Sequence, residues 1–109
     1  MRDRGLLYDI LDSARLIVQY VDGFTPETFG RDTKTQDAVI RRIEIIGEAA
    51  KRLTRAAVAE LPTVDWGAMR GMRDRIVHRY WDVDLDKVWA AAEADVPALI
   101  VAVEGFLLA

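Results

Sequence analysis

The sequence predicts an all-α protein that folds as an antiparallel bundle of four to five helices. Apolar residues recur every three or four positions along each long segment, and glycines and prolines separate those segments. No segment alternates apolar and polar residues as a half-buried strand does. With 109 residues the chain suits one hydrophobic core, so we expect a single domain over residues 1–109.

The first helix is expected from about Asp3 to Asp22. Gly23 ends it, because glycine readily adopts the left-handed conformation that closes a helix. Thr25, followed by proline and glutamate, then starts a short helical turn that breaks near Gly30. The inner face of the first helix is an apolar stripe at helical spacing: Leu7, Ile10, Leu11, Ala14, Ile17, Val18 and Val21.

Asp32 or Thr33 is expected to cap the second long helix. Gly47 lies in its inner stripe, where the missing side chain would let another helix approach closely. Glu48 and Arg52 have the i, i+4 spacing of an ion pair along one helix. The apolar members of the stripe are Val39, Ile43, Ile46, Ala50 and Leu53.

The third helix is expected to begin at Trp66, with Asp65 as its cap, and to run through a cluster of arginines. Residues 54–61 before it either continue the second helix or form a separate short helix that ends at Pro62.

The last helix follows an interruption at residues 80–84, where Asp82 or Asp84 can act as its cap. Pro97 lies inside this helix and removes a backbone donor, so we expect a kink or interruption near Asp95.

Composition excludes several classes of protein. The chain has no cysteine, which excludes disulfides, thiolate catalysis and cysteine-based zinc sites and fits a reducing cytoplasm. The N-terminus mixes both charge signs, so we expect no signal peptide. The longest apolar stretch, residues 96–109, is broken by Pro97 and Glu104 and falls short of the roughly 20 residues that span a bilayer. We therefore expect a cytoplasmic protein without a membrane segment.

Positive charge is concentrated in one short segment, although the net charge is −3. The single histidine, His78, lies within it, and Asp74 is the one acid among the arginines. This distribution predicts one anion-binding site, whereas a general nucleic-acid binder would be basic overall. A solvated helix face is the alternative. The arginines are Arg70, Arg73, Arg75 and Arg79.

The same segment carries a recognisable motif: an arginine, a polar residue, three further positions, a histidine and, two residues later, a tyrosine. Arg73, Asp74, His78 and Tyr80 occupy these positions. The pattern resembles the active-site signature of the HEPN superfamily, and the tyrosine makes it similar to the HepT-like branch of minimal toxins. Residues 38–51 and 82–89 also resemble that branch, so the resemblance covers nearly the whole domain.

The resemblance implies metal-independent cleavage of RNA. Arg73 would hold the scissile phosphate, since a guanidinium stays charged and matches phosphate oxygens. His78 would take a proton from the ribose 2′-hydroxyl or give one to the leaving oxygen. Asp74 would either orient one of these two groups or cap the helix locally. RNA supplies its own nucleophile, so we expect no metal, no cofactor and no DNA substrate. Further RNA-phosphate contacts are expected from Arg70, Arg75 and Arg79.

Tyr80 has a separate role in HepT-like systems, as the resemblance implies. The partner there is an antitoxin, a minimal nucleotidyltransferase of the MntA type, which attaches adenylate to this tyrosine. A bulky anionic nucleotide beside the phosphate site would block it.

The spacing of Arg73 and His78 favours a homodimer. Five residues along an ideal helix separate them by roughly 140° around the axis and about 7.5 Å along it. One straight helix therefore does not aim both side chains at one atom, whereas a two-fold axis beside the helix lets two protomers share a cleft. The resemblance to HEPN proteins implies the same arrangement.

Two other functions remain open. One is a non-catalytic subunit of the same fold that binds RNA or scaffolds other proteins, and the other is a helical dimer that docks an acidic partner. The presence of both Arg73 and His78 favours the ribonuclease. Glu44 and Glu48 lack the histidines of a bundle metal site. Core or dimer packing is favoured over base stacking for the tryptophans: Trp66, Trp81 and Trp89.

Overall fold

The computed structural model describes residues 2–109, so Met1 of the predicted domain lies outside the described residues. Four long helical segments form the bundle: α1 (Arg2–Val21), α3 (Thr33–Lys51), α5 (Trp66–His78), and a C-terminal segment of α6 (Leu85–Ala90), the π-helical turn η2 (Ala91–Asp95) and α7 (Val96–Leu107). Three short elements connect them: α2 (Pro26–Phe29), α4 (Arg55–Ala59) and the 3₁₀ turn η1 (Tyr80–Asp82).

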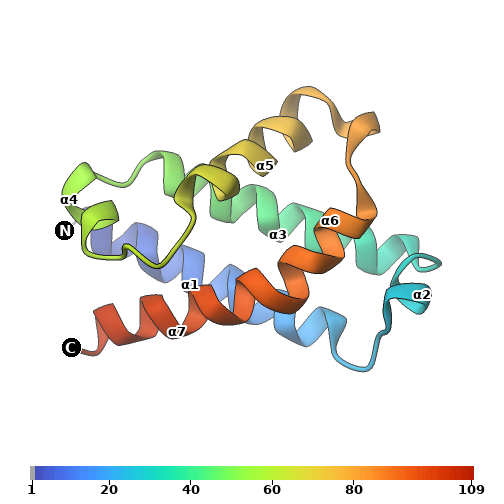
Figure 1. The fold of residues 1–109 in the computed structure, drawn as a ribbon, viewed down its shortest axis with the longest axis horizontal. Coiled ribbons are helices and arrows are strands. Elements are labelled where there is room, and N and C mark those ends of the chain that lie inside the picture. The colour runs from blue at the N-terminus through green and yellow to red at the C-terminus, as the bar shows by residue number, and fades with distance from the viewer. Residues whose placement is uncertain (1) are drawn as a thin grey trace.

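The long segments run alternately in opposite directions (Figure 1). α1 packs against both α3 and α7, and α5 lies on the other side of α3. The expectation of an all-α antiparallel bundle is therefore confirmed for the described chain. This arrangement leaves α5 joined to the bundle mainly through α3.

Helix ends follow the local signals in the sequence. Gly23 has a φ of 80°, the left-handed conformation, directly after α1. The Thr25 and Thr28 side chains each accept a backbone N–H of the other residue, a reciprocal cap on α2. Asp32, rather than Thr33, caps α3, its Oδ1 lying 3.1 Å from the backbone N of Thr35. These predictions needed only residues within one turn of the helix end, and they are confirmed.

Residues 54–61 contain a separate short helix, α4, which decides between the two alternatives, although it ends at Ala59 and not at Pro62. The Thr54 side chain caps α4, and Asp3 in turn holds Thr54. The Asp3 carboxylate accepts the Thr54 backbone N–H at 2.9 Å and its hydroxyl at 2.6 Å. These hydrogen bonds lower the pKa of Asp3 below its usual value. The start of α1 therefore fixes the turn that leads from α3 towards α5.

The C-terminal segment bends where Pro97 predicted an interruption. Residues Ala91–Asp95 widen into a π-helical turn directly before α7, in which Pro97 occupies the first turn. A π-helical turn accommodates the hydrogen bond that proline cannot donate and makes room for its ring. Asp84 caps α6 through the backbone N–H of Asp86, so the fold uses one of the two predicted caps.

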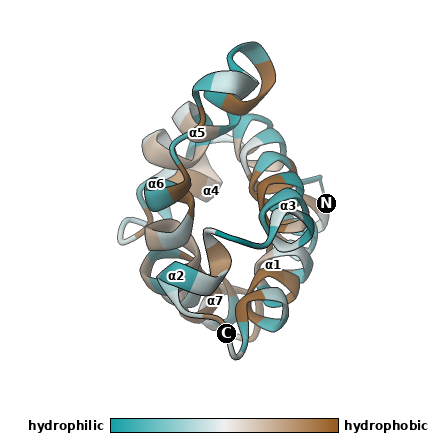
Figure 2. Ribbon diagram, turned by 90° about the vertical axis from the view of Figure 1, so that its right-hand side faces the viewer, coloured by the Kyte–Doolittle hydropathy of each residue, from teal (hydrophilic) through white to brown (hydrophobic). Residues whose placement is uncertain are grey.

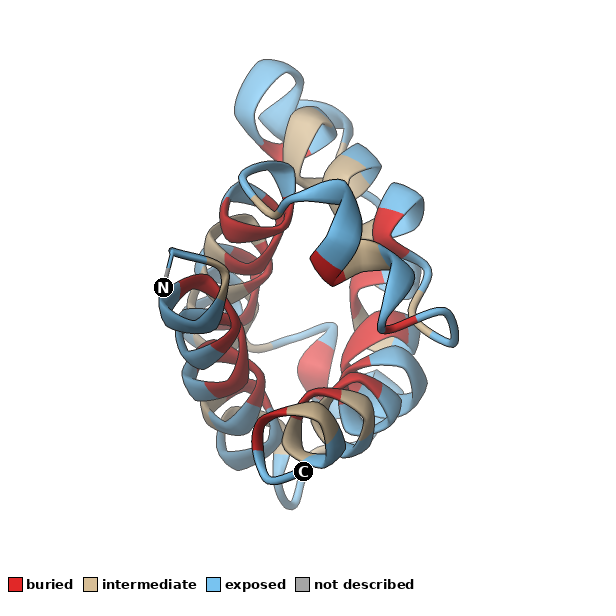
Figure 3. Ribbon diagram, turned by 90° about the vertical axis from the view of Figure 1, so that its left-hand side faces the viewer, coloured by how far each residue is buried: buried red, intermediate tan, exposed pale blue. Residues whose placement is uncertain are grey.

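The hydrophobic core lies between α1, α3 and α7, whose buried and apolar faces point inwards (Figures 2 and 3). Trp66 is buried, and Trp89 packs on Phe29 with ring centroids 5.3 Å apart. Trp81 is 82% exposed, so core packing is wrong for this tryptophan. No helix within residues 2–109 combines the length and apolarity needed to cross a bilayer.

Candidate phosphate site and its exposed neighbour

The contact between α3 and α5 is unusually close at Gly47. A Cβ atom at this position would lie 2.2 Å from the Cβ of Arg73 and 2.8 Å from the carbonyl oxygen of Met69. No side chain other than hydrogen fits there, because real Cβ atoms do not approach other heavy atoms so closely. The predicted role of Gly47 in close helix approach is confirmed. Its consequence is that the stem of Arg73 rests directly on α3.

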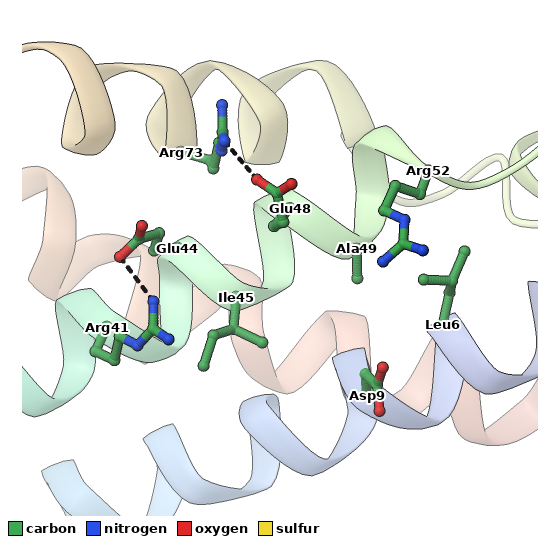
Figure 4. A pocket seen from close by; sticks show the side chains of 9 residues that line it. All are labelled: Leu6, Asp9, Arg41, Glu44, Ile45, Glu48, Ala49, Arg52 and Arg73. Atoms are coloured by element: carbon green, nitrogen blue, oxygen red, sulfur yellow. Dashed lines mark hydrogen bonds and ion pairs between the residues drawn. The ribbon is translucent and has the colours of Figure 1, made fainter.

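Two carboxylates hold the guanidinium of Arg73. Glu48 Oε2 lies 2.5 Å from Nη2, and Asp74 Oδ1 lies 3.1 Å from Nη1 (Figure 4 shows the pair with Glu48). The Arg73 side chain is 18% exposed, and its Nε–H is buried without a hydrogen-bond partner among residues 2–109. The hydrogen bond to Asp74 is the largest cause of a raised Arg73 pKa, which burial partly opposes.

Lys51 completes this cluster from α3. Its Nζ lies 3.1 Å from Asp74 Oδ1, so Asp74 bridges Lys51 and Arg73. The hydrogen bonds from Lys51 and then Arg73 lower the pKa of Asp74. Glu48, Lys51, Arg73 and Asp74 form a charge quartet whose two cations and two anions sum to zero. Asp74 thus contacts Arg73, one of the two groups that it is expected to orient, and the orienting role itself stays a prediction.

Glu48 corrects one prediction from the sequence. Its i, i+4 spacing indicated an ion pair with Arg52, whereas the structure pairs Glu48 with Arg73 of α5. The reason is that the close helix contact at Gly47 brings a second cation within reach of Glu48. No sequence-local signal could have indicated this partner, because the two residues are 25 positions apart.

His78 lies in a different environment from Arg73. It is the last residue of α5, and its side chain is exposed. Among residues 2–109 no hydrogen bond or ion pair joins it to Arg73, which is turned towards α3. One protomer therefore holds the two predicted catalytic residues in separate surroundings.

Of the other predicted arginines, Arg75 and Arg79 lie at the end of α5, whereas Arg70 lies in its first half. Arg75 and Arg79 both pair with Asp82 on η1, at 3.6 and 3.2 Å. Arg70 is half-buried and forms no ion pair within the described residues. A single carboxylate thus forms ion pairs with both Arg75 and Arg79.

Tyr80 is anchored to α3 by a hydrogen bond that sequence reasoning missed. Its hydroxyl donates to Asp37 Oδ1 at 3.1 Å, while the residue as a whole stays 52% exposed. This hydrogen bond is the main reason why the pKa of Tyr80 is raised, and partial burial adds to it. The tyrosine hydroxyl is thus held by Asp37, while much of the residue is open to the surface.

A cleft of about 460 Å³ opens beside Arg73, along the face of α3 that looks towards α1 (Figure 4). Its charged lining consists of three acids and three arginines: Asp9, Glu44, Glu48, Arg41, Arg52 and Arg73. Within residues 2–109 no group of three or more histidine, aspartate or glutamate side chains is placed to hold a metal ion. The cleft therefore offers a held guanidinium among mixed charges, and His78 is not among its lining residues.

Comparison with known proteins places the chain in a family. A family model described as ribonuclease HepT-like matches residues 10–105. A candidate RNase of Methanocaldococcus jannaschii is 37% identical over 94 residues, which cover 86% of this chain and 78% of that protein. The probable ribonuclease HepT of Thermococcus cleftensis is 39% identical over 96 residues, with 88% and 87% covered. No solved structure matches the chain significantly. The family match over most of its length shows that the chain belongs to the HepT-like ribonuclease family.

Proposed function

We propose that this protein is an endoribonuclease that cleaves RNA phosphodiester bonds with Arg73 and His78. The observation that carries the proposal is the arginine itself, which a HepT-like chain holds against α3 through the contact at Gly47. A guanidinium fixed in this way can bind a phosphate without losing much side-chain freedom. Asp74 orients it, and three more arginines supply charge for neighbouring phosphates: Arg70, Arg75 and Arg79.

His78 carries the proton in this proposal. The ribose 2′-hydroxyl attacks phosphorus and the bond to the leaving oxygen breaks. An imidazole can accept the first proton or donate the last. Its exposure at the end of α5 leaves it accessible to a polymeric substrate. DNA lacks the nucleophile, so RNA is the substrate class, and no metal or cofactor takes part in the step.

The working unit is a homodimer in which Arg73 of one protomer and His78 of the other act on one phosphate. Their separate surroundings within one protomer support this assignment. Mixing inactive Arg73→Ala and His78→Ala proteins tests it. Random pairing puts half of the chains in mixed dimers with one intact site each, so about a quarter of the activity should return. A mixture that stays inactive despite subunit exchange contradicts the shared site.

The biological setting is a cytoplasmic toxin–antitoxin pair. An MntA-like nucleotidyltransferase antitoxin attaches adenylate to Tyr80, an exposed residue whose hydroxyl is anchored to Asp37. Incubation of the chain with this partner and ATP should add the mass of adenylate to Tyr80 and abolish RNA cleavage. A Tyr80→Phe protein should stay unmodified. Modification at another residue would remove this role from Tyr80.

One observation favours a second candidate, a non-catalytic RNA-binding or scaffolding subunit of the same fold. The charge quartet is neutral, as a purely structural ion-pair cluster would be. Expression in a bacterial host separates the two. Growth arrest that disappears in folded Arg73→Ala and His78→Ala variants supports the ribonuclease, whereas equal behaviour of all three proteins supports the subunit.

A further inference from the structure

Glu48 and Asp74 both neutralise Arg73, but they are held differently. Asp74 also binds Lys51 and belongs to the same helix as Arg73. Glu48 has Arg73 as its one ion-pair partner among residues 2–109; its side chain is 52% exposed, close to the 48% of Asp74, so the number of partners and not exposure separates the two carboxylates. Glu48 also borders the cleft of about 460 Å³, which leaves room for the carboxylate to rotate away. Glu48 is therefore the easier of the two carboxylates to displace.

The geometry of the guanidinium makes this displacement necessary. Arginine binds a phosphate best through two N–H groups on one edge. Nε of Arg73 is buried, so edges that include it are closed to a ligand. The remaining edge consists of Nη1 and Nη2, and in the resting protein Asp74 contacts the first and Glu48 the second. A phosphate that binds this edge meets Asp74 at Nη1 and Glu48 at Nη2, and of these two carboxylates only Asp74 is also held by Lys51.

Charge leads to the same conclusion. The quartet is neutral at rest, so an anion that arrives at Arg73 meets no net attraction from it. When Glu48 rotates away, Lys51 and Arg73 outweigh Asp74 by one positive charge. Charged contacts to phosphates largely determine how tightly proteins bind nucleic acids.

We propose that Glu48 is the resting counter-ion of Arg73 and that the substrate phosphate displaces it, so that this carboxylate sets the affinity of the site for RNA. The inference rests on the proposed function in that RNA is taken as the ligand. A lone phosphate ion competes poorly with Glu48. An RNA strand displaces it because other contacts hold the strand in place.

The test is RNA binding by Glu48→Gln, with Glu44→Gln as the matched control. Glu44 lies on the same helix and in the same cleft, but it pairs with Arg41 at 3.2 Å. The probe is a fluorescent mixed-sequence 2′-O-methyl oligoribonucleotide, which lacks the free nucleophile and stays intact. Removing a like charge next to the bound phosphate should tighten binding on the order of tenfold in Glu48→Gln, and less than about threefold in Glu44→Gln.

Kinetics give a second measure with a cleavable RNA. KM of Glu48→Gln should fall with the dissociation constant while kcat does not rise, a split that a merely structural residue would not produce. Glu48→Asp keeps the charge on a shorter stem and should bind RNA with an affinity between those of the wild type and Glu48→Gln. It also serves as the test if Glu48→Gln does not fold.

The possible results separate this inference from the proposed function. Equal or weaker RNA binding by Glu48→Gln, or an equal gain in Glu44→Gln, overturns the counter-ion role even if the wild type cleaves RNA. Tighter binding without cleavage by any variant supports the counter-ion role and removes the ribonuclease. Failure of the wild type and Glu48→Gln to bind RNA at all removes both.

Discussion

The middle and the end of α5 differ sharply. In the middle, Arg73 is 18% exposed, rests on Gly47 and touches two carboxylates. At the end, His78 is exposed, and Trp81, only three residues further on, is 82% exposed. The same helix thus carries one side chain that the protomer holds on several sides and another that it leaves open.

This difference indicates which half of the proposed chemistry is complete in a single chain. The phosphate-binding half is preorganised, since packing and ion pairs fix the guanidinium before any ligand arrives. The proton-transfer half lacks a partner for His78 within residues 2–109. A second protomer or the RNA itself has to supply the missing contacts.

The largest expected effects are losses of kcat in two variants of α5, of which only one should also lose stability. His78→Ala should lower kcat for RNA by about 10²–10⁴-fold, as expected for loss of a general acid–base group. It should change the free energy of unfolding by less than about 0.5 kcal/mol, because the side chain is exposed. Arg73→Ala should lower kcat by about 10²–10³-fold and also lower the melting temperature.

Cleavage assays and thermal denaturation of both variants provide the comparison. A marked loss of stability in His78→Ala, or none in Arg73→Ala, would show that the two side chains do not differ in what they contribute to the stability of the fold.

The tryptophans should show the same contrast in stability alone. Trp89 packs on Phe29, so Trp89→Ala should destabilise the fold by about 3 kcal/mol. Trp81→Ala should stay within about 0.5 kcal/mol of the wild type as a monomer, because so much of its surface is already in solvent. Urea denaturation measures both values, and a large loss in Trp81→Ala would mean that a second protomer covers it.

A substitution at Gly47 tests whether the close contact between α3 and α5 keeps Arg73 in place. Gly47→Ala should cost about 1–3 kcal/mol of stability, because the new methyl group collides with Arg73 and pushes α5 outward. RNA cleavage should fall as well. Gly71→Ala on α5 is the control: nothing lies within 4 Å of a Cβ there, so it should stabilise the helix by about 0.5–1 kcal/mol. If both alanine variants were equally stable, the close approach would not be a determinant of the site.

The smallest expected effect concerns the phenol of Tyr80. Asp37→Asn removes the carboxylate that raises its pKa, so the phenol should ionise at lower pH in the variant. A raised pKa stabilises the fold below the ordinary tyrosine value of about 10, and this contribution disappears as pH rises through the folded value. Phenolate absorbance, with Tyr80→Phe to identify the residue, gives the shift. An unchanged titration curve would show that Asp37 does not hold the hydroxyl in solution.

Helix positions and their ends could be predicted from the sequence because their causes are local. Gly23, Thr25, Asp32 and Asp65 act on backbone groups within about one turn of themselves. Apolar periodicity likewise predicted the buried face of α3, except that Leu53, the last residue of the predicted stripe, lies beyond the end of the helix and is only half-buried. The motif from Arg73 to Tyr80 was also visible in the sequence.

The sequence by itself therefore determined the helical bundle, its caps and the identity of the residues proposed to act on RNA. Only the tertiary structure decided which partners those residues meet. Glu48 turns to Arg73 instead of Arg52, and Tyr80 reaches Asp37 across 43 positions. Local rules cover neighbours three or four residues apart. Contacts between helices depend on where the helices cross, and here a missing side chain at Gly47 fixes the crossing of α3 and α5.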